Sequence, residues 1–230
     1  MLSATGRSGA MTQTKARIFI VDDHPLVREW LTNLIKKHSD LSVCGEADDP
    51  AKALKAISED PPDLAIIDLS LGSSSGIDLI ESIRAAVPSV ALIVLSMHDE
   101  QFYAERCIRA GARGYIMKRE TAKNVIGAIQ EVLGGNLYLS KRMTELLVQK
   151  MVSTESQNVA QPIAQLSERE LQVFKLLGQG HDIDEIAKML DVNIKTVHTY
   201  AARIKEKIKI STTAELLREA RRWHGALPVG

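Results

Sequence analysis

The chain has 230 residues, of which 45% are hydrophobic and 25% are charged, as in an ordinary folded protein of one large or two small domains. No apolar run approaches the ~20 residues of a membrane span, and the start of the chain lacks the apolar core of a signal peptide. We therefore expect a cytoplasmic protein without membrane contact. Cys44 and Cys107 have no partners at metal-ligand spacing and are expected to be buried free thiols.

The net charge of zero hides an uneven distribution. Residues 16–140 hold 13 Lys and Arg against 18 Asp and Glu, whereas residues 166–230 hold 11 against 9. An acidic first part and a mildly basic second part indicate different partners for the two. Residues 1–15 are rich in Ser, Thr and Gly and predict a disordered tail, in which Met11 is a second possible start.

Five apolar strands alternate with five amphipathic helices between residues 16 and 138. Strands are expected at 17–21, 41–47, 64–68, 91–96 and 115–118, and helices at 25–38, 50–59, 77–83, 100–110 and 121–133. This alternation predicts an α/β domain with a flavodoxin-like, doubly wound, five-stranded parallel sheet in the order 2-1-3-4-5. No glycine-rich phosphate loop follows the first strand, which argues against a dinucleotide-binding domain.

The pattern changes after residue 138. Residues 139–165 predict a linker that contains an amphipathic helix at 141–151 and a polar stretch broken by Pro162. Residues 166–226 predict an all-α domain of four helices, which begins at a capping box of Ser167 and Glu170. Two of these helices, at 183–190 and 194–208, are joined by a tight turn, which is typical of a helix-turn-helix.

Acidic residues follow two strands that neighbour each other in the predicted sheet. Asp22 and Asp23 end the first strand, and Asp68 ends the third. Three carboxylates at one sheet edge repel each other unless a cation neutralises them, and oxygen ligands of this kind suit Mg²⁺. Each residue by itself is also explained as a solvated group or a helix cap, so the interpretation depends on their joint occurrence.

Two further polar residues end strands at the same edge. Lys118 follows the fifth strand and provides a compact cation for a phosphate oxygen, and Ser96 ends the fourth strand with a hydroxyl. A lysine, a hydroxyl and a bound cation around one aspartate favour phosphorylation of that aspartate.

Two sets of motifs resemble known domains. Phe19–Pro25, Ile67–Leu69, Leu95–Ser96 and Gly114–Lys118 resemble a response-regulator receiver domain. Leu166–Glu170 and Ile194–Tyr200 resemble the LuxR-type helix-turn-helix. Together they span about Arg17 to Trp223, and the chain resembles the NarL/FixJ family of response regulators.

The resemblance implies a two-component regulator of transcription. It implies that Asp68 accepts a phosphoryl group from a histidine kinase. Mg²⁺ would be held by Asp22, Asp23, Asp68 and the backbone carbonyl of Ser70, with Asp23 and Asp68 as the direct carboxylate ligands. Ser96 and Tyr115 match the family's switch hydroxyl and switch aromatic residue, and Lys118 matches its phosphate-binding lysine.

One segment departs from the family pattern. Leu71 to Ser75 stand where the family usually has Met-Pro, and we expect a looser loop there. After phosphorylation, Ser96 and Lys118 would move towards the added oxygens, and Tyr115 would turn inward.

The helix at 194–208 is the expected recognition helix, with Val197 and Ile204 in the core. The residues expected to face double-stranded DNA are Lys195, Thr196, His198, Thr199, Arg203, Lys205 and Lys207. Among them Lys195, Lys205 and Lys207 are assigned to phosphates, and His198, Thr199 and Arg203 to bases or grooves. We expect a homodimer on two half-sites; the last helix, with Leu216 and Leu217, either forms the dimer contact or completes a four-helix core.

Two other functions remain open on the residues alone. A Mg²⁺-dependent phosphatase with an aspartyl phosphate would need a second carboxylate two residues after Asp68, where Ser70 stands. A DNA-binding protein whose first domain only dimerises would not need the carboxylates or Lys118. Both alternatives therefore fit less well than a non-enzymatic regulator that is switched by phosphorylation.

Overall fold

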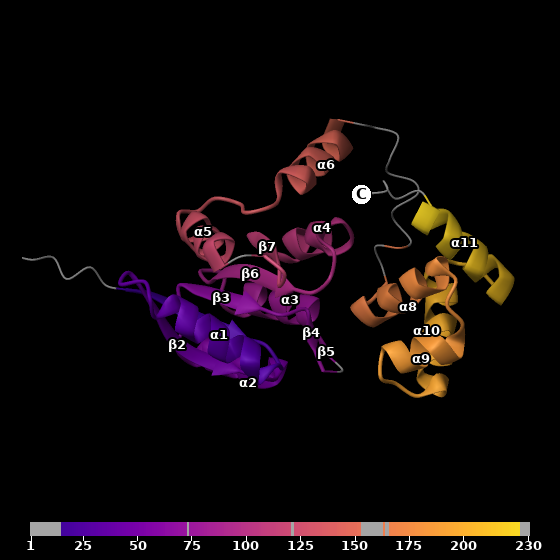
Figure 1. The fold of residues 1–230 in the computed structure, drawn as a ribbon, viewed down its shortest axis with the longest axis horizontal. Coiled ribbons are helices and arrows are strands. Elements are labelled where there is room, and N and C mark those ends of the chain that lie inside the picture. The colour runs from indigo at the N-terminus through magenta and orange to yellow at the C-terminus, as the bar shows by residue number, and fades with distance from the viewer. Residues whose placement is uncertain (1–14, 73, 121, 153–162, 164–165, 226–230) are drawn as a thin grey trace, which may run out of the picture. The chain divides into compact units, whose positions relative to one another are not determined.

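The computed structural model (Figure 1) describes residues 15–72, 74–120, 122–152, 163 and 166–225. Contacts between Cα atoms divide the chain into two compact units, with the boundary between Leu139 and Ser140. Almost all of the predicted tail, and most of the predicted polar linker at 153–165, lie outside the described residues. None of the helices in the described ranges combines the length and apolar character that a membrane crossing requires.

The first unit contains a parallel sheet of five strands. The strands are β1 (Ala16–Val21), β2 (Leu41–Ala47), β3 (Leu64–Ile67), β6 (Ala91–Ser96) and β7 (Gly114–Met117). Their order is β2-β1-β3-β6-β7, which is the predicted 2-1-3-4-5 order. Every residue of β3 and β7 is buried, as expected for strands that are covered on both faces.

Five helices flank this sheet: α1 (Pro25–Ile35), α2 (Pro50–Glu59), α3 (Gly76–Ala86), α4 (Glu100–Ala110) and α5 (Ala122–Leu133). Helices α1 and α5 pack against alternate residues of the strands in one apolar cluster, which includes Ile18, Ile20 and Ile66. Helices α2, α3 and α4 lie side by side and bury other side chains. The two layers of helices cover the faces of the sheet, so the ends of the strands are left for a functional site.

Two short strands follow Asp68. Strands β4 (Ser70–Leu71) and β5 (Ser74–Ser75) pair in antiparallel fashion as a small hairpin. Gly72 adopts a φ of 60°, a left-handed conformation that favours glycine. The described part of this segment is thus paired by its backbone, and a loop looser than the family's stays a prediction.

The two cysteines differ in burial. Cys107 is buried as predicted, whereas Cys44 is exposed. Cys44 lies on β2, which is an edge strand. An apolar strand pattern does not distinguish an edge strand from a central one, so the prediction for Cys44 was wrong.

Within the described residues, the second unit contains the helices α6 (Lys141–Val152), α8 (Glu168–Gln179), α9 (Ile183–Met189), α10 (Ile194–Lys207) and α11 (Thr213–Gly225). Ser167 and Glu170 form the predicted capping box at the start of α8, and Asp182 and Glu185 form a second one at α9. Helix α8 packs against α10 and α11. Leu216 of α11 is buried inside this unit, so this residue completes the four-helix core.

Candidate functional site

The carboxyl ends of β1, β3, β6 and β7 bring the predicted polar residues of the first unit together. The backbone hydrogen bonds of the sheet continue for one residue beyond the ends of β3 and β7. The N–H of Asp68 donates to the Val21 carbonyl at 2.8 Å, and the N–H of Lys118 donates to the Ser96 carbonyl at 2.8 Å. These bonds set Asp68 and Lys118 at the sheet edge, with their side chains on rigid backbone.

Lys118 joins two buried carboxylates. Its Nζ lies 2.7 Å from Asp22 Oδ2 and 2.7 Å from Asp68 Oδ2. The side chains of Asp22 and Asp68 are 2% and 3% exposed. One ammonium therefore neutralises part of the charge of two carboxylates from separate strands.

Burial and charge oppose each other at this pair. Burial raises the pKa of Asp68 to about 6, although the charge of Lys118 acts to lower it. For Lys118, burial lowers the pKa, but the charges of Asp68 and Asp22 outweigh it and leave the pKa above its usual value. At neutral pH Asp68 is thus largely a carboxylate beside a protonated lysine.

Asp23 completes an acidic cluster that fits a cation. Its Oδ2 accepts the N–H of Gly72 at 3.0 Å, which ties it to the hairpin. Its Oδ1 is buried and has no hydrogen-bond partner within the described residues, while His24 Nδ1 lies 2.7 Å from it. Oxygens of Asp22, Asp23 and Asp68 lie within 4.8 Å of one another. Three oxygen donors, one of them without a hydrogen-bond donor, fit a hard cation such as Mg²⁺.

Two neighbours of this cluster were not foreseen as part of the site. His24 offers a ring nitrogen within the same 4.8 Å group as the carboxylates, and its position directly after Asp23 was the available signal. Arg28 of α1 donates from Nη1 to the carbonyl of Asp22 at 2.7 Å, which holds the backbone of that residue. That the Ser70 carbonyl is a cation ligand stays a prediction.

His98 connects the two predicted switch residues. Its N–H donates to Ser96 Oγ at 3.1 Å, and its carbonyl accepts the Tyr115 hydroxyl at 2.9 Å. The ring Nε2 lies 2.8 Å from Ser70 Oγ, and the ring stacks on Tyr103 with centroids 4.7 Å apart. Tyr115 is buried in this structure, and its inward turn on phosphorylation stays a prediction.

Gly76 leaves no room for a side chain next to the acceptor. A Cβ at this position would lie 2.3 Å from the Asp68 carbonyl oxygen and 2.6 Å from Leu69 Cα. Helix α3 therefore starts in direct contact with the backbone of Asp68. The sequence showed Gly76 only as the end of a loop, because close approach of distant backbone is not visible from spacing.

Helix α10 presents an exposed polar face, as predicted. The side chains of Val197 and Ile204 are fully buried, so the opposite side of the helix faces solvent. The exposed residues of the predicted set are Lys195, His198, Thr199 and Arg203, and the half-buried ones are Thr196, Lys205 and Lys207. Asn193, which was not singled out, caps α10 by accepting the N–H of Lys195 at 2.9 Å.

Lys207 has a partner inside the second unit. Its Nζ lies 2.7 Å from Glu170 Oε2, and the Glu170 side chain is 3% exposed. This ion pair joins the end of α10 to the capping box of α8. The phosphate contact predicted for Lys207 would therefore compete with a packing role.

A doubly wound sheet with a buried aspartate–lysine edge, followed by a helix-turn-helix unit, defines a response regulator with a DNA-binding output domain. Residues 18–130 match the response regulator receiver domain, and residues 164–220 match the luxR family of bacterial regulatory proteins. The chain belongs to the family of transcriptional response regulators that join a receiver domain to a LuxR-type helix-turn-helix, as its motifs indicated.

Relatives and solved structures agree with this assignment. The oxygen regulatory protein NreC of Staphylococcus carnosus is 31% identical over 208 residues, which are 89% of this chain and 96% of the relative. A LuxR-family two-component response regulator from Aurantimonas sp. has 31% identity and a TM-score of 0.56 over 61% of this chain and 100% of its own. RcsB of Salmonella typhimurium, with 22% identity and a TM-score of 0.55 over 91% of this chain and 99% of its own, shares the fold.

Proposed function

We propose that this protein is a transcription factor switched by phosphorylation of Asp68. The observation that carries the proposal is the contact of Lys118 Nζ with Asp68 and Asp22, at 2.7 Å from each. Beside it lies a buried oxygen of Asp23 that accepts no hydrogen bond from the described residues. A buried carboxylate next to a fixed ammonium and a cation-binding cluster is suited to accept a phosphoryl group.

The chain's own residues account for the transfer step. An oxygen of Asp68 attacks the phosphorus of a phosphohistidine on a histidine kinase, and the P–N bond of the donor breaks. Asp22, Asp23, Asp68 and the Ser70 carbonyl would hold Mg²⁺, which when bound would neutralise charge on the transferred group. Lys118 exchanges its contact with Asp68 for one with a phosphoryl oxygen.

No general acid follows the acceptor. Ser70 stands two residues after Asp68, and its hydroxyl lies 2.8 Å from His98 Nε2, so no carboxylate is present there to protonate a leaving group. The phosphoryl group would therefore act as a mark rather than an intermediate of turnover. This supports a regulatory protein over the phosphatase alternative.

The mark would be read by Ser96 and Tyr115. Phosphorylation adds about −1.5 to −2 charge and three acceptor oxygens. The Ser96 hydroxyl would turn to donate to one of these oxygens and release the N–H of His98. Since the His98 carbonyl also accepts the Tyr115 hydroxyl, the loop before α4 would move together with that ring.

The output would be binding of a homodimer to double-stranded DNA in the cytoplasm. Helix α10 would enter the major groove, with Lys195 and Lys205 on phosphates and His198, Thr199 and Arg203 near bases, and Thr196 beside them. One helix-turn-helix covers one half-site, so two copies are needed for a full site. A structure of RcsB, which shares the fold, contains two dimers bound to two parallel DNAs, which supports this arrangement.

Substitution of the acceptor tests the proposal. Asp68→Asn should abolish labelling of the full chain by radioactive acetyl phosphate with Mg²⁺, because the amide oxygen is not a nucleophile. Asp78→Asn, at an exposed aspartate of α3, is the matched control and should label like the unchanged chain. Equal labelling of the Asp68 variant would refute the assignment, as would labelling that persists unchanged after Mg²⁺ is removed with EDTA.

A further inference from the structure

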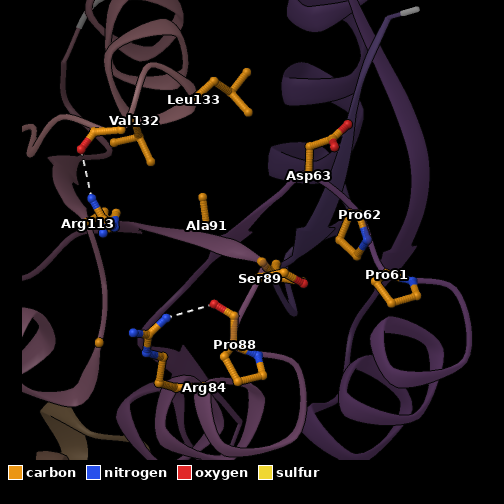
Figure 2. Close-up of a pocket in the computed structure, with 13 residues that line it drawn as sticks. Pro61, Pro62, Asp63, Arg84, Pro88, Ser89, Ala91, Arg113, Val132 and Leu133 are labelled. Atoms are coloured by element: carbon orange, nitrogen blue, oxygen red, sulfur yellow. Dashed lines mark hydrogen bonds between the residues drawn. The ribbon is translucent and has the colours of Figure 1, made fainter.

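A cavity of about 630 Å³ lies at the amino ends of the strands, the opposite end of the sheet from Asp68. Its walls come from the segment before β3, the connection between α3 and β6, and the segments next to β7 and α5 (Figure 2). Because all five strands are parallel, their amino ends meet here while their carboxyl ends meet at Asp68. The cavity is therefore separate from the phosphorylation site.

Two arginines on one side of this cavity have no carboxylate partner within the described residues. Arg84 Nη1 donates to the Pro88 carbonyl at 2.8 Å, and Arg113 Nη1 donates to the Gly135 carbonyl at 2.7 Å (Figure 2). Each guanidinium is thus held by one nitrogen, and its other N–H donors remain for a ligand. Other arginines of the receiver, such as Arg17 and Arg109, pair with carboxylates instead.

Gly111 packs against the stem of Arg84. Gly111 has a φ of 119°, and a Cβ there would lie 3.0 Å from Arg84 Cγ and 3.2 Å from Arg84 Cδ. The stem of Arg84 therefore lies directly over Gly111, two residues before Arg113. A side chain at position 111 would displace Arg84, so the glycine does more than end α4.

The far side of the cavity has the opposite charge. Asp63 lies across from the arginines (Figure 2), and its Oδ2 accepts the backbone N–H of Arg17 at 2.7 Å. Pro61, Pro62 and Pro88 line the walls, and their fixed φ angles limit rearrangement. The cavity is thus a fixed, polar site with cationic and anionic sides and a volume typical of small-molecule sites.

We propose that this cavity binds a small phosphorylated metabolite. Arg84 and Arg113 hold its phosphate through charge-assisted hydrogen bonds, and Asp63 accepts a hydrogen bond from a hydroxyl or amine of the same molecule. Arginine forks match the oxygen geometry of phosphate. Both guanidinium groups line the same cavity and are exposed, so an entering oxyanion can reach their free N–H donors.

The test is a titration of the full chain with glycerol 3-phosphate and, in parallel, with inorganic phosphate and with glycerol. Backbone amide shifts in ¹H–¹⁵N spectra report binding, and EDTA keeps cations from the Asp68 cluster. Saturable shifts are expected at Arg84, Gly111 and Arg113, but not at Ser96 or Lys118. Glycerol 3-phosphate should bind more tightly than inorganic phosphate, because only it reaches Asp63, and glycerol should cause no shift.

The variant Arg84→Gln/Arg113→Gln should weaken binding at least about tenfold, because two charge-assisted bonds are lost. Arg109→Gln, which removes an arginine paired with Glu105, is the matched control and should bind like the unchanged chain. If the double variant does not fold, Arg113→Lys keeps the charge, loses the fork and should weaken binding severalfold. Equal binding by the double variant or by Arg113→Lys, or shifts that do not saturate, would overturn the proposal.

Discussion

The carboxylate edge of the receiver and the exposed face of α10 differ in how much of their chemistry is set within the chain. At the edge, Lys118 already contacts Asp22 and Asp68 at 2.7 Å, and both carboxylates are buried. On α10, the exposed Lys195 and Arg203 form no ion pair within the described residues. The edge is preorganised by the protein, whereas the helix face leaves its charges to a partner.

This difference has a physical cause. Buried charges must be compensated inside the protein, because removal from water costs several kcal/mol per ion. Exposed charges are stabilised by water and counterions, and counterions are released when DNA phosphates replace them. Substitutions at the edge should therefore alter folding and chemistry, while substitutions on the helix face should alter only binding.

Gly76→Val should have the largest effect. Its Cβ would lie 2.3 Å from the Asp68 carbonyl oxygen, so α3 or the acceptor strand must move. We expect a loss of about 3 kcal/mol or more in the free energy of unfolding of the receiver, with loss of labelling at Asp68. Urea unfolding followed by Trp30 fluorescence, in a Trp223→Phe background, measures the first effect.

Gly127→Ala is the matched control for this substitution. Gly127 lies inside α5, and a Cβ there would meet nothing within 4 Å. The change should raise stability by up to about 1 kcal/mol, since alanine favours helix more than glycine does. A Gly76→Val chain as stable as the unchanged protein would mean that the edge is not held by this contact.

The sequence predicted most of the receiver edge but only part of its surroundings. Apolar runs that end in Asp22, Asp68, Ser96 and Lys118 place these residues at one edge, because parallel strands end on the same side of a sheet. The roles of His98 and Gly76 depend on segments that meet only in the folded chain. Spacing along the chain carries no signal for such contacts.

In the second unit, helical periodicity distinguished buried from exposed positions, but it did not distinguish a lysine that is free to contact DNA from one that forms an internal ion pair. It correctly predicted that Val197 and Ile204 face the core. It treated Lys195 and Lys207 alike, because both are lysines on the polar side of one helix. The ion pair of Lys207 with Glu170 follows from how α8 packs on α10, which no local pattern describes.

Lys207→Ala should therefore destabilise the second unit. It leaves the Glu170 carboxylate, which is 3% exposed, without a cation. We expect a loss of about 2 kcal/mol at pH 7, below the value for a fully buried pair because Lys207 is half-buried. Urea unfolding followed by Trp223, which packs against Phe174, measures it in a Trp30→Phe background.

The same pair predicts a pH dependence. Burial acts to raise the pKa of Glu170, but Lys207 and Ser167 outweigh it and hold the pKa below 4.5. The stability that this group contributes is present above about pH 4.5 and is lost as the pH falls through the lower folded-state value. The difference in the free energy of unfolding between the unchanged chain and Lys207→Ala should shrink as Glu170 becomes protonated. A difference that stays constant with pH would contradict a stabilising ion pair between Lys207 and Glu170.

Lys195→Ala should have the smallest effect on the fold and a defined effect on binding. Because Lys195 is exposed and forms no ion pair with the residues that the structure describes, stability should change by no more than about 0.5 kcal/mol. Affinity for every DNA sequence should fall to a similar extent, and the slope of log K against log salt should decrease by about one unit. Arg203→Ala, at a residue assigned to bases or grooves, should instead reduce discrimination between sequences. Fluorescence anisotropy over a salt series, with one selected and one random duplex, separates the two results, and a sequence-dependent loss for Lys195→Ala would show that α10 is as specifically arranged as the receiver edge.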